Sequence, residues 1–214
     1  MRGRGSAILA GHRVMSTTRL LVLGVVSGYG TAHGYLVHNE LVSWGADEWA
    51  NVKWGSIYHA LRQLAKEGKL EALPAEDGSG RIDYRLTPSG EEAFRALLRT
   101  ALSDAGPHAD LLAAGLAFLA VLPRAEAIAL LEQRLAALEA AREVIAPYVG
   151  SFDDWKKPGT EHVPELFGLW HHNADIAAIW TAGLIERLRA GAYTFADDEP
   201  LASRDGTPFR ERGD

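Results

Sequence analysis

The sequence contains no cysteine, and its 214 residues include no apolar run near the ~20 residues of a membrane span. Without cysteine there is no disulfide, no thiolate nucleophile and no cysteine-ligated metal site, as is common in a reducing compartment. The apolar stretch 7–10 is too short for the core of a signal peptide. These absences predict a cytoplasmic protein without membrane contact.

An excess of positive charge is also missing, since the net charge is −6. The acidic residues are unevenly distributed: residues 1–105 hold 12 Lys or Arg and 11 Asp or Glu, whereas residues 106–214 hold 10 and 17. A nucleic-acid partner would therefore depend on where the cations of the near-neutral first half lie, rather than on their number. The length of 214 residues suits one large domain or two small ones, and the hydrophobic content of 47% is ample for a core.

Residues 56–67 are predicted to form a helix with two different faces, and Gly68 suits its end. Apolar residues recur at helical spacing on one face. The other face is rich in hydrogen-bond donors, which could enter a DNA major groove. The apolar face comprises Ile57, Leu61 and Leu64, and the polar face comprises His59, Arg62, Gln63 and Lys66. Taken alone, the pattern also fits an ordinary amphipathic surface helix.

A β-hairpin is predicted directly after this helix. The short apolar run 70–73 leads into the glycine-rich turn 74–80, and residues 81–86 alternate between polar and apolar side chains. Thr87 and Pro88 then suit the cap and first position of another helix. A helix, a hairpin and a second helix, with Arg81 near the hairpin tip, form the pattern of a winged helix-turn-helix domain.

These residues carry a resemblance to a known family. The run Gly55-Ser56-Ile57-Tyr58-x-x-Leu61-x-x-Leu64-x-x-x-Gly68-x-Leu70, followed by Tyr84-Arg85-Leu86-Thr87-x-x-Gly90, resembles the PadR family of bacterial transcriptional regulators. The resemblance covers roughly residues 17–103 and departs at Trp54, where the family usually carries proline. It implies a homodimeric, repressor-type protein that binds double-stranded DNA through the winged domain and dimerises through helices.

The resemblance and the donor-rich helix together give a predicted DNA-contact set. Near the start of the helix, the hydroxyl groups of Ser56 and Tyr58 could reach phosphate, because a helix N-terminus favours anions; a packing role for Tyr58 is equally compatible with the sequence. The predicted contacts are Ser56, Tyr58, His59, Arg62, Gln63, Lys66 and Arg81.

The remainder of the first half is predicted to support this domain. Residues 1–16 show no periodic pattern and are expected to form a mobile arm, followed by a buried helix that includes residues 20–26. Thr31 is a plausible cap for a second helix that ends near Trp44. Gly34 inside that helix suggests close packing against a neighbour. The predicted winged domain spans residues 17–105.

Residues 106–196 are predicted to form a helical dimerisation domain, followed by a charged tail at 197–214. Apolar residues keep heptad spacing from Ile128 to Ile145, with Arg142 in the one broken position, which favours packing of helix against helix. The helix predicted over 164–190 carries apolar residues on two neighbouring faces. One of these faces could be covered by a second copy of the chain.

Enzymatic chemistry has no recognisable motif in this chain, since a phosphate-binding glycine loop, a Gly-x-Ser-x-Gly elbow and a His-Glu-x-x-His run are all missing. His171 and His172 are adjacent, so on a helix they point about 100° apart and do not readily ligate one ion. Asp175, one turn after His171, could bond to it. No metal site, catalytic residue or cofactor is predicted.

A small-molecule effector site is the remaining candidate, because several regulators of the resembled family respond to aromatic or hydrophobic compounds. Aromatic side chains can stack on such a compound while a histidine anchors its polar end. The predicted residues are Trp155, Trp170, His171 and Trp180. Packing of these aromatics in the core of a dimer interface is the simpler explanation. The alternative functions are a winged-helix module that binds proteins rather than specific DNA, and an enzyme centred on His171 and His172.

Overall fold

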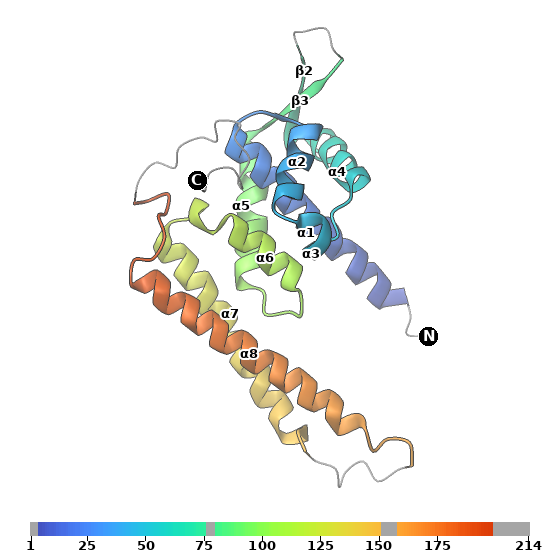
Figure 1. The fold of residues 1–214 in the computed structure, drawn as a ribbon, viewed down its shortest axis with the longest axis vertical. Helices are drawn as coiled ribbons and strands as arrows, with labels where there is room; N and C mark the ends of the chain where they lie inside the picture. The colour runs from blue at the N-terminus through green and yellow to red at the C-terminus, as the bar shows by residue number, and fades with distance from the viewer. Residues whose placement is uncertain (1–3, 76–79, 151–157, 199–214) are drawn as a thin grey trace. The chain divides into compact units, whose positions relative to one another are not determined.

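The computed structural model describes residues 4–75, 80–150 and 158–198 (Figure 1). These residues form two compact units. Among the described residues, the first contains the chain up to Ala101 together with His108–Leu119, and the second contains Leu102–Pro107 and the chain from Ala120 to Asp198. The predicted boundary at residue 105 differs from this division, because helix α6 (Ala109–Ala117) groups with the first unit. In the described residues no helix is long and apolar enough to cross a bilayer.

Helix α1 (Arg4–Tyr29) forms the centre of the first unit. Every residue from Leu20 to Val26 is buried, as its continuous apolar sequence predicts. Phe118 packs so closely on this helix that a Cβ atom at Gly24 would lie 2.2 Å from its ring. Thr17 donates a hydrogen bond of 3.1 Å to Asp110 of α6. These contacts explain why α6 belongs to this unit.

The start of α1 corrects one prediction. Residues 1–16 were expected to form an arm without regular structure, but the helix begins at Arg4 and continues without interruption into the buried segment. Propensity alone gave no sign of this, because glycines at positions 5 and 11 interrupt the residues that favour helix.

Three short strands form an antiparallel sheet in the order β1 (Ala32–His33), β3 (Ile82–Leu86), β2 (Leu70–Pro74). The hairpin of β2 and β3 confirms the predicted wing, with Leu70 opposite Leu86 and Pro74 opposite Ile82. Strand β1, which pairs Ala32 with Tyr84, was not predicted.

Two further helices connect the sheet to the core. Helix α2 (Gly34–Ser43) is capped by His33, whose Nδ1 accepts a 3.2 Å hydrogen bond from the Leu36 amide, so the expected Thr31 cap was wrong. Helix α3 (Ala46–Trp49) is a single turn that leads toward α4 (Trp54–Lys66). Figure 1 shows α2 and α4 side by side, with β2 and β3 extending past them.

Helix α5 (Pro88–Ser103) begins where the wing ends. Thr87 caps it as predicted, since its Oγ1 accepts a hydrogen bond of 3.1 Å from the Gly90 amide. Thr87 also donates to the Gly68 carbonyl at 2.7 Å, and Ser89 donates to the same oxygen at 3.0 Å. The first turn of α5 is therefore fixed to the turn between α4 and β2.

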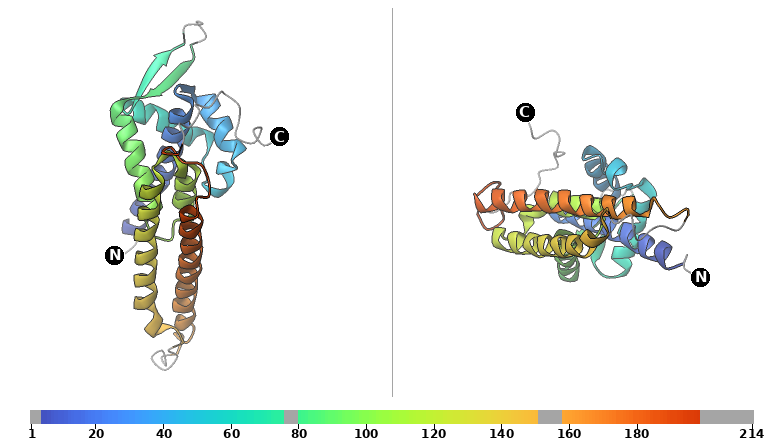
Figure 2. Two further views of the ribbon diagram at one scale, coloured as in Figure 1. Left: turned by 90° about the vertical axis from the view of Figure 1, so that its left-hand side faces the viewer. Right: turned by 90° about the horizontal axis from the view of Figure 1, so that it is seen from below.

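The second unit is built on two long helices, α7 (Arg124–Ile145) and α8 (Val163–Arg189), which lie side by side (Figure 2). Single-turn 3-10 helices occur at Leu119–Val121 and Ala146–Tyr148. Leu131 and Leu138 of the predicted heptad pattern are buried. Arg142, the polar residue in that pattern, donates a 2.6 Å hydrogen bond to Asp175 on α8. The sequence had suggested that Asp175 bonds to His171, but in the structure Asp175 pairs with Arg142 of α7.

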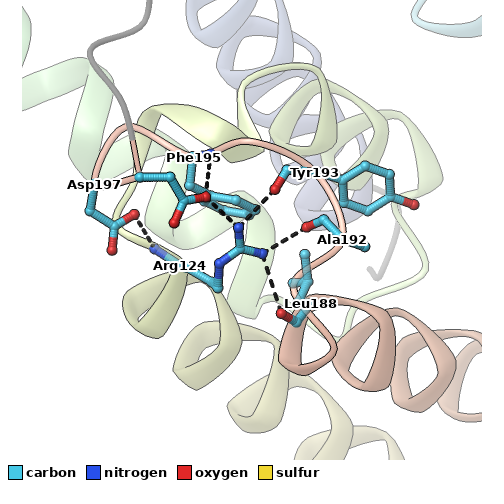
Figure 3. A network of polar contacts seen from close by, with 7 residues as sticks. Arg124, Leu188, Ala192, Tyr193, Phe195 and Asp197 are labelled. Atoms are coloured by element: carbon cyan, nitrogen blue, oxygen red, sulfur yellow. Dashed lines mark hydrogen bonds and ion pairs between the residues drawn. The ribbon is translucent and has the colours of Figure 1, made fainter.

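Arg124 joins the start of α7 to the end of α8 (Figure 3). Its guanidinium donates to the carbonyl groups of Leu188, Ala192 and Tyr193, at 3.3, 2.7 and 2.7 Å. It also pairs with Asp198 and lies 4.6 Å from the centre of the Phe195 ring. A planar guanidinium with several N–H donors can hydrogen-bond to several of the carbonyl groups that a helix leaves unpaired at its C-terminus. Backbone and Arg124 hydrogen bonds also lower the pKa of Asp198.

Candidate nucleic-acid interface

Helix α4 presents the predicted polar face of His59, Arg62, Gln63 and Lys66, which we call the reading face, because its opposite face is anchored in the core. Ile57, Leu61 and Leu64 are buried, as predicted, and Ala60 is buried with them. Lys53 precedes the helix in an extended conformation, and Gly68 follows it with φ of +70°, a value that favours glycine. The helix therefore has a fixed orientation and fixed ends.

Six of the seven predicted contact residues lie on α4, and none of the six is fully buried. His59, Arg62 and Lys66 are exposed, whereas Gln63 is half-buried. Residues at i, i+3 and i+7 lie on one side of a helix, so these donors form a row along α4. Their contact with DNA remains a prediction at this stage.

The cations of this row differ from most others in the first unit. In the part of the chain that the structure describes, Arg62 and Lys66 form no salt bridge. Arg19, by contrast, binds Glu67 through two hydrogen bonds of 2.9 and 2.5 Å, and this bonding lowers the pKa of the Glu67 carboxyl. Unpaired cations beside neutral donors give a local positive surface on a unit whose total charge is close to zero.

Ser56 and Tyr58 have structural roles that the sequence did not distinguish from DNA contact. The Ser56 hydroxyl donates to the Lys53 carbonyl at 2.6 Å and accepts from the Lys53 amide at 3.0 Å. The ring of Tyr58 lies against Gly34, where a Cβ atom would be only 2.6 Å away. This contact confirms the prediction that Gly34 allows close packing.

The wing carries its arginines in ion pairs. Arg81 lies 3.2 Å from Asp83, and Arg85 lies 2.7 Å from Glu71 on the neighbouring strand. A phosphate would have to compete with Asp83 for Arg81, the predicted wing contact. Tyr84 points to the other side of the hairpin and is buried, and burial raises the pKa of its hydroxyl while the charge of Arg62 partly opposes the shift.

An aromatic cluster that the sequence did not predict lies beside α4, and we call it the aromatic ridge. It consists of Tyr35, His38, Trp54 and Tyr58. The ring centres of Trp54 and His38 are 4.4 Å apart, those of Trp54 and Tyr58 are 4.9 Å apart, and those of Trp54 and Tyr35 are 6.2 Å apart. Tyr35 is 57% exposed and Trp54 is 46% exposed. Two of these residues come from α2 and two from α4, so no local sequence pattern could reveal the cluster.

Among the described residues of the predicted effector set, the two tryptophans do not converge within one chain. Trp170 and Trp180 are both on α8 and are 46% and 41% exposed. Ten residues of helix separate them, which corresponds to about 15 Å along the axis. His171 is half-buried beside Trp170, and Trp155 lies outside the described residues.

A metal centre finds no support in the described ranges, where no three His, Asp or Glu residues lie close enough to hold an ion. His171 and His172, the focus of the enzymatic alternative, lack a nearby third ligand there. The candidate functional site is the reading face of α4 in the first unit, together with the wing and the aromatic ridge beside it.

Comparison with known proteins gives structural neighbours only. No family model matches the sequence, and no curated protein matches it. Among solved structures, PadR of Bacillus subtilis bound to operator DNA is 19% identical, covers 79% of this chain and 98% of its own, and has a TM-score of 0.36. A PadR-like transcriptional regulator of Bacillus cereus is 18% identical, with coverages of 81% and 99% and a TM-score of 0.34. Both identity and TM-score are low, so function has to be argued from this chain's own residues.

Proposed function

We propose that the chain is a DNA-binding transcriptional regulator of the PadR type. The observation that carries the proposal is the row of exposed donors on α4, in which Arg62 and Lys66 have no salt-bridge partner among the described residues. A helix anchored by one face and donor-rich on the other is what the major groove admits.

Each residue of the reading face has a role that follows from its chemistry. Arg62 and Gln63 can donate to base edges, Arg to guanine and Gln to adenine. Lys66 and His59 supply phosphate contacts, which fix the register of the helix on the duplex. Arg81 reaches the backbone from the wing after exchanging Asp83 for a phosphate oxygen.

We further propose that the protein acts as a homodimer. Helix α8 exposes a row of large apolar side chains, and an extended exposed apolar surface is typical of a site of interaction with another surface. They are Leu166, Leu169, Trp170, Ile176, Ile179 and Trp180, each at least 41% exposed. A two-fold dimer presents two reading helices to a symmetric operator, with half-sites about 10 base pairs apart or a multiple of that distance. Bound there, the dimer represses transcription by occupying the operator.

A small aromatic or hydrophobic compound is the proposed effector, with Trp170, His171 and Trp180 as the described candidates for its site. Because about 15 Å of helix separates the two tryptophans, a small ligand in one chain meets only one of them. Binding at such a site would release DNA by favouring a dimer geometry whose reading helices no longer fit successive grooves.

The first test is a fluorescence-anisotropy titration with two duplexes of equal length, one from the gene's own upstream region and one random, at two salt concentrations. The proposal predicts salt-sensitive binding and a preference of ~10³ or more for the upstream duplex or for one obtained by random-sequence selection. Weak and equal binding to all duplexes would instead favour the protein-interaction module.

Two variants sharpen this test. Arg62→Ala is expected to cost about 1–3 kcal/mol on the specific duplex and little on random DNA if Arg62 reads a base. Arg189→Ala on α8 serves as the control, because it removes only exposed ion pairs with Glu132 and Glu186. Equal losses on both duplexes would make Arg62 a phosphate contact.

A further inference from the structure

Trp54 is the most unusual residue of the aromatic ridge because it combines exposure with rigidity. It is 46% exposed, yet its indole contacts three other rings, from His38 at 4.4 Å to Tyr35 at 6.2 Å. Aromatic pairs at these distances stabilise one another. Little conformational freedom is left for the indole to lose on binding, which is a property of residues that contribute strongly to recognition.

The position of Trp54 places this apolar surface at the start of the reading face. It is the first residue of α4, and in helix-turn-helix domains the N-terminal residues of the recognition helix contact base edges. Tyr58 follows one turn later, and Arg62 one turn after that, so the apolar edge runs continuously into the row of donors.

The protruding apolar group on the base edges of the major groove is the C5-methyl of thymine, which lies among hydrogen-bond donors and acceptors. We propose that Trp54 is a specificity-determining residue that recognises a thymine in each half-site by packing its indole against this methyl group. This inference rests on the proposed function. It assigns a base preference to a residue outside the predicted contact set.

Deoxyuridine provides the decisive probe because it differs from thymidine in a duplex only by the missing methyl group. The wild-type protein is first used to select a duplex from random sequence. Each thymine of that duplex is then replaced singly by deoxyuridine, and the dissociation constants are measured for the wild type, Trp54→Ala, Trp54→Phe and Val42→Ala. Val42 lies on α2 outside the ridge and is 40% exposed, so its variant controls for loss of an exposed apolar side chain.

At one thymine per half-site, the wild type is expected to bind the deoxyuridine duplex about fourfold more weakly, the effect of burying one methyl-sized group. Trp54→Ala should reduce that ratio to about one and also bind the thymine duplex more weakly. Trp54→Phe should keep an intermediate ratio, and Val42→Ala should keep the wild-type ratio. Far-ultraviolet circular dichroism confirms that each variant is folded.

The results separate this inference from the function on which it rests. A wild type that selects no sequence overturns both. A wild type that binds its selected duplex tightly, but with no thymine sensitive to methyl removal, overturns the role of Trp54 alone. If a thymine is sensitive to methyl removal but the ratio of the dissociation constants of the deoxyuridine and thymine duplexes is the same in Trp54→Ala as in the wild type, the role of Trp54 is also overturned. The methyl contact then belongs to another residue.

Discussion

Replacement of Gly90 by alanine should destabilise the first unit through a clash with the backbone. A Cβ atom at this position would lie 1.9 Å from the Lys69 carbonyl oxygen and 2.9 Å from its carbon. Carbon and carbonyl oxygen normally approach to about 3.3–3.6 Å, so the two chain segments would have to separate by about 1.5 Å. Backbone on both sides leaves no flexible side chain to absorb that shift.

The separation breaks identifiable interactions. The Thr87 amide donates to the Lys69 carbonyl at 3.1 Å, and two hydroxyls donate to Gly68 beside it. Each bond contributes about 0.5–1.5 kcal/mol, and overpacking itself costs about 1–3 kcal/mol. We expect the free energy of unfolding to fall by about 3 kcal/mol, a large part of the 5–15 kcal/mol typical of a domain.

Urea unfolding followed by far-ultraviolet circular dichroism measures this loss. With an m-value of about 2 kcal/mol/M, the midpoint should fall by about 1.5 M. Gly55→Ala is the matched control, because apart from its chain neighbours and the backbone of its own helix no atom lies within 4 Å of the added Cβ, and its stability should stay within about 0.5 kcal/mol of wild type. A loss below about 1 kcal/mol in Gly90→Ala would refute the docking of α5 on the turn after α4.

Three further substitutions test other parts of the chain. Ile179→Asp places a charge on a side chain that is 67% exposed on α8; it should convert a dimer into a monomer in sedimentation equilibrium while leaving helicity unchanged. Arg124→Ala removes donors from three carbonyls at the end of α8 and should cost the second unit about 2–3 kcal/mol in thermal unfolding, with only partial recovery in Arg124→Lys. Arg19→Gln should cost about 0.5 kcal/mol at neutral pH. The pKa of Glu67 is lowered in the folded state, so the stability difference between wild type and Arg19→Gln should disappear as the pH falls below the ordinary glutamate pKa of 4.5 and through the lower folded-state pKa. A stability difference that persists in acid would exclude this ion pair as its source.

The local chemistry of the sequence was sufficient to predict the central elements of the first unit. Helical spacing identified the buried residues of α4, alternation identified β3, and Thr87 was predicted to cap α5. Each of these signals depends on a few neighbouring residues. Strand β1 was not predicted because two residues are too few to show a period. The strand depends on the pairing of Ala32 with Tyr84, and these two residues are 52 positions apart in the sequence.

Contacts between distant segments were the part that the sequence could not provide. His171 and Asp175 have the spacing of a bonded pair on one helix, but Arg142 of α7 competes for the carboxylate and forms the bond. The aromatic ridge likewise requires α2 and α4 to be neighbours. The predicted contact residues Arg62 and Arg81 look equivalent in sequence, and only the fold reveals that Arg81 pairs with Asp83.

The paired arginines of the wing have a consequence for how a regulator would search a genome. An arginine already neutralised by a carboxylate releases few counterions when it meets phosphate, so it adds little to binding on arbitrary sequence. Arg81 and Arg85 would then engage only where the reading helix has already found its bases and brought the backbone close enough to displace Asp83 and Glu71. Short residence on random DNA leaves the protein free to sample new sites. Carboxylates that compete with phosphate for the wing arginines would in this way speed the search for the operator.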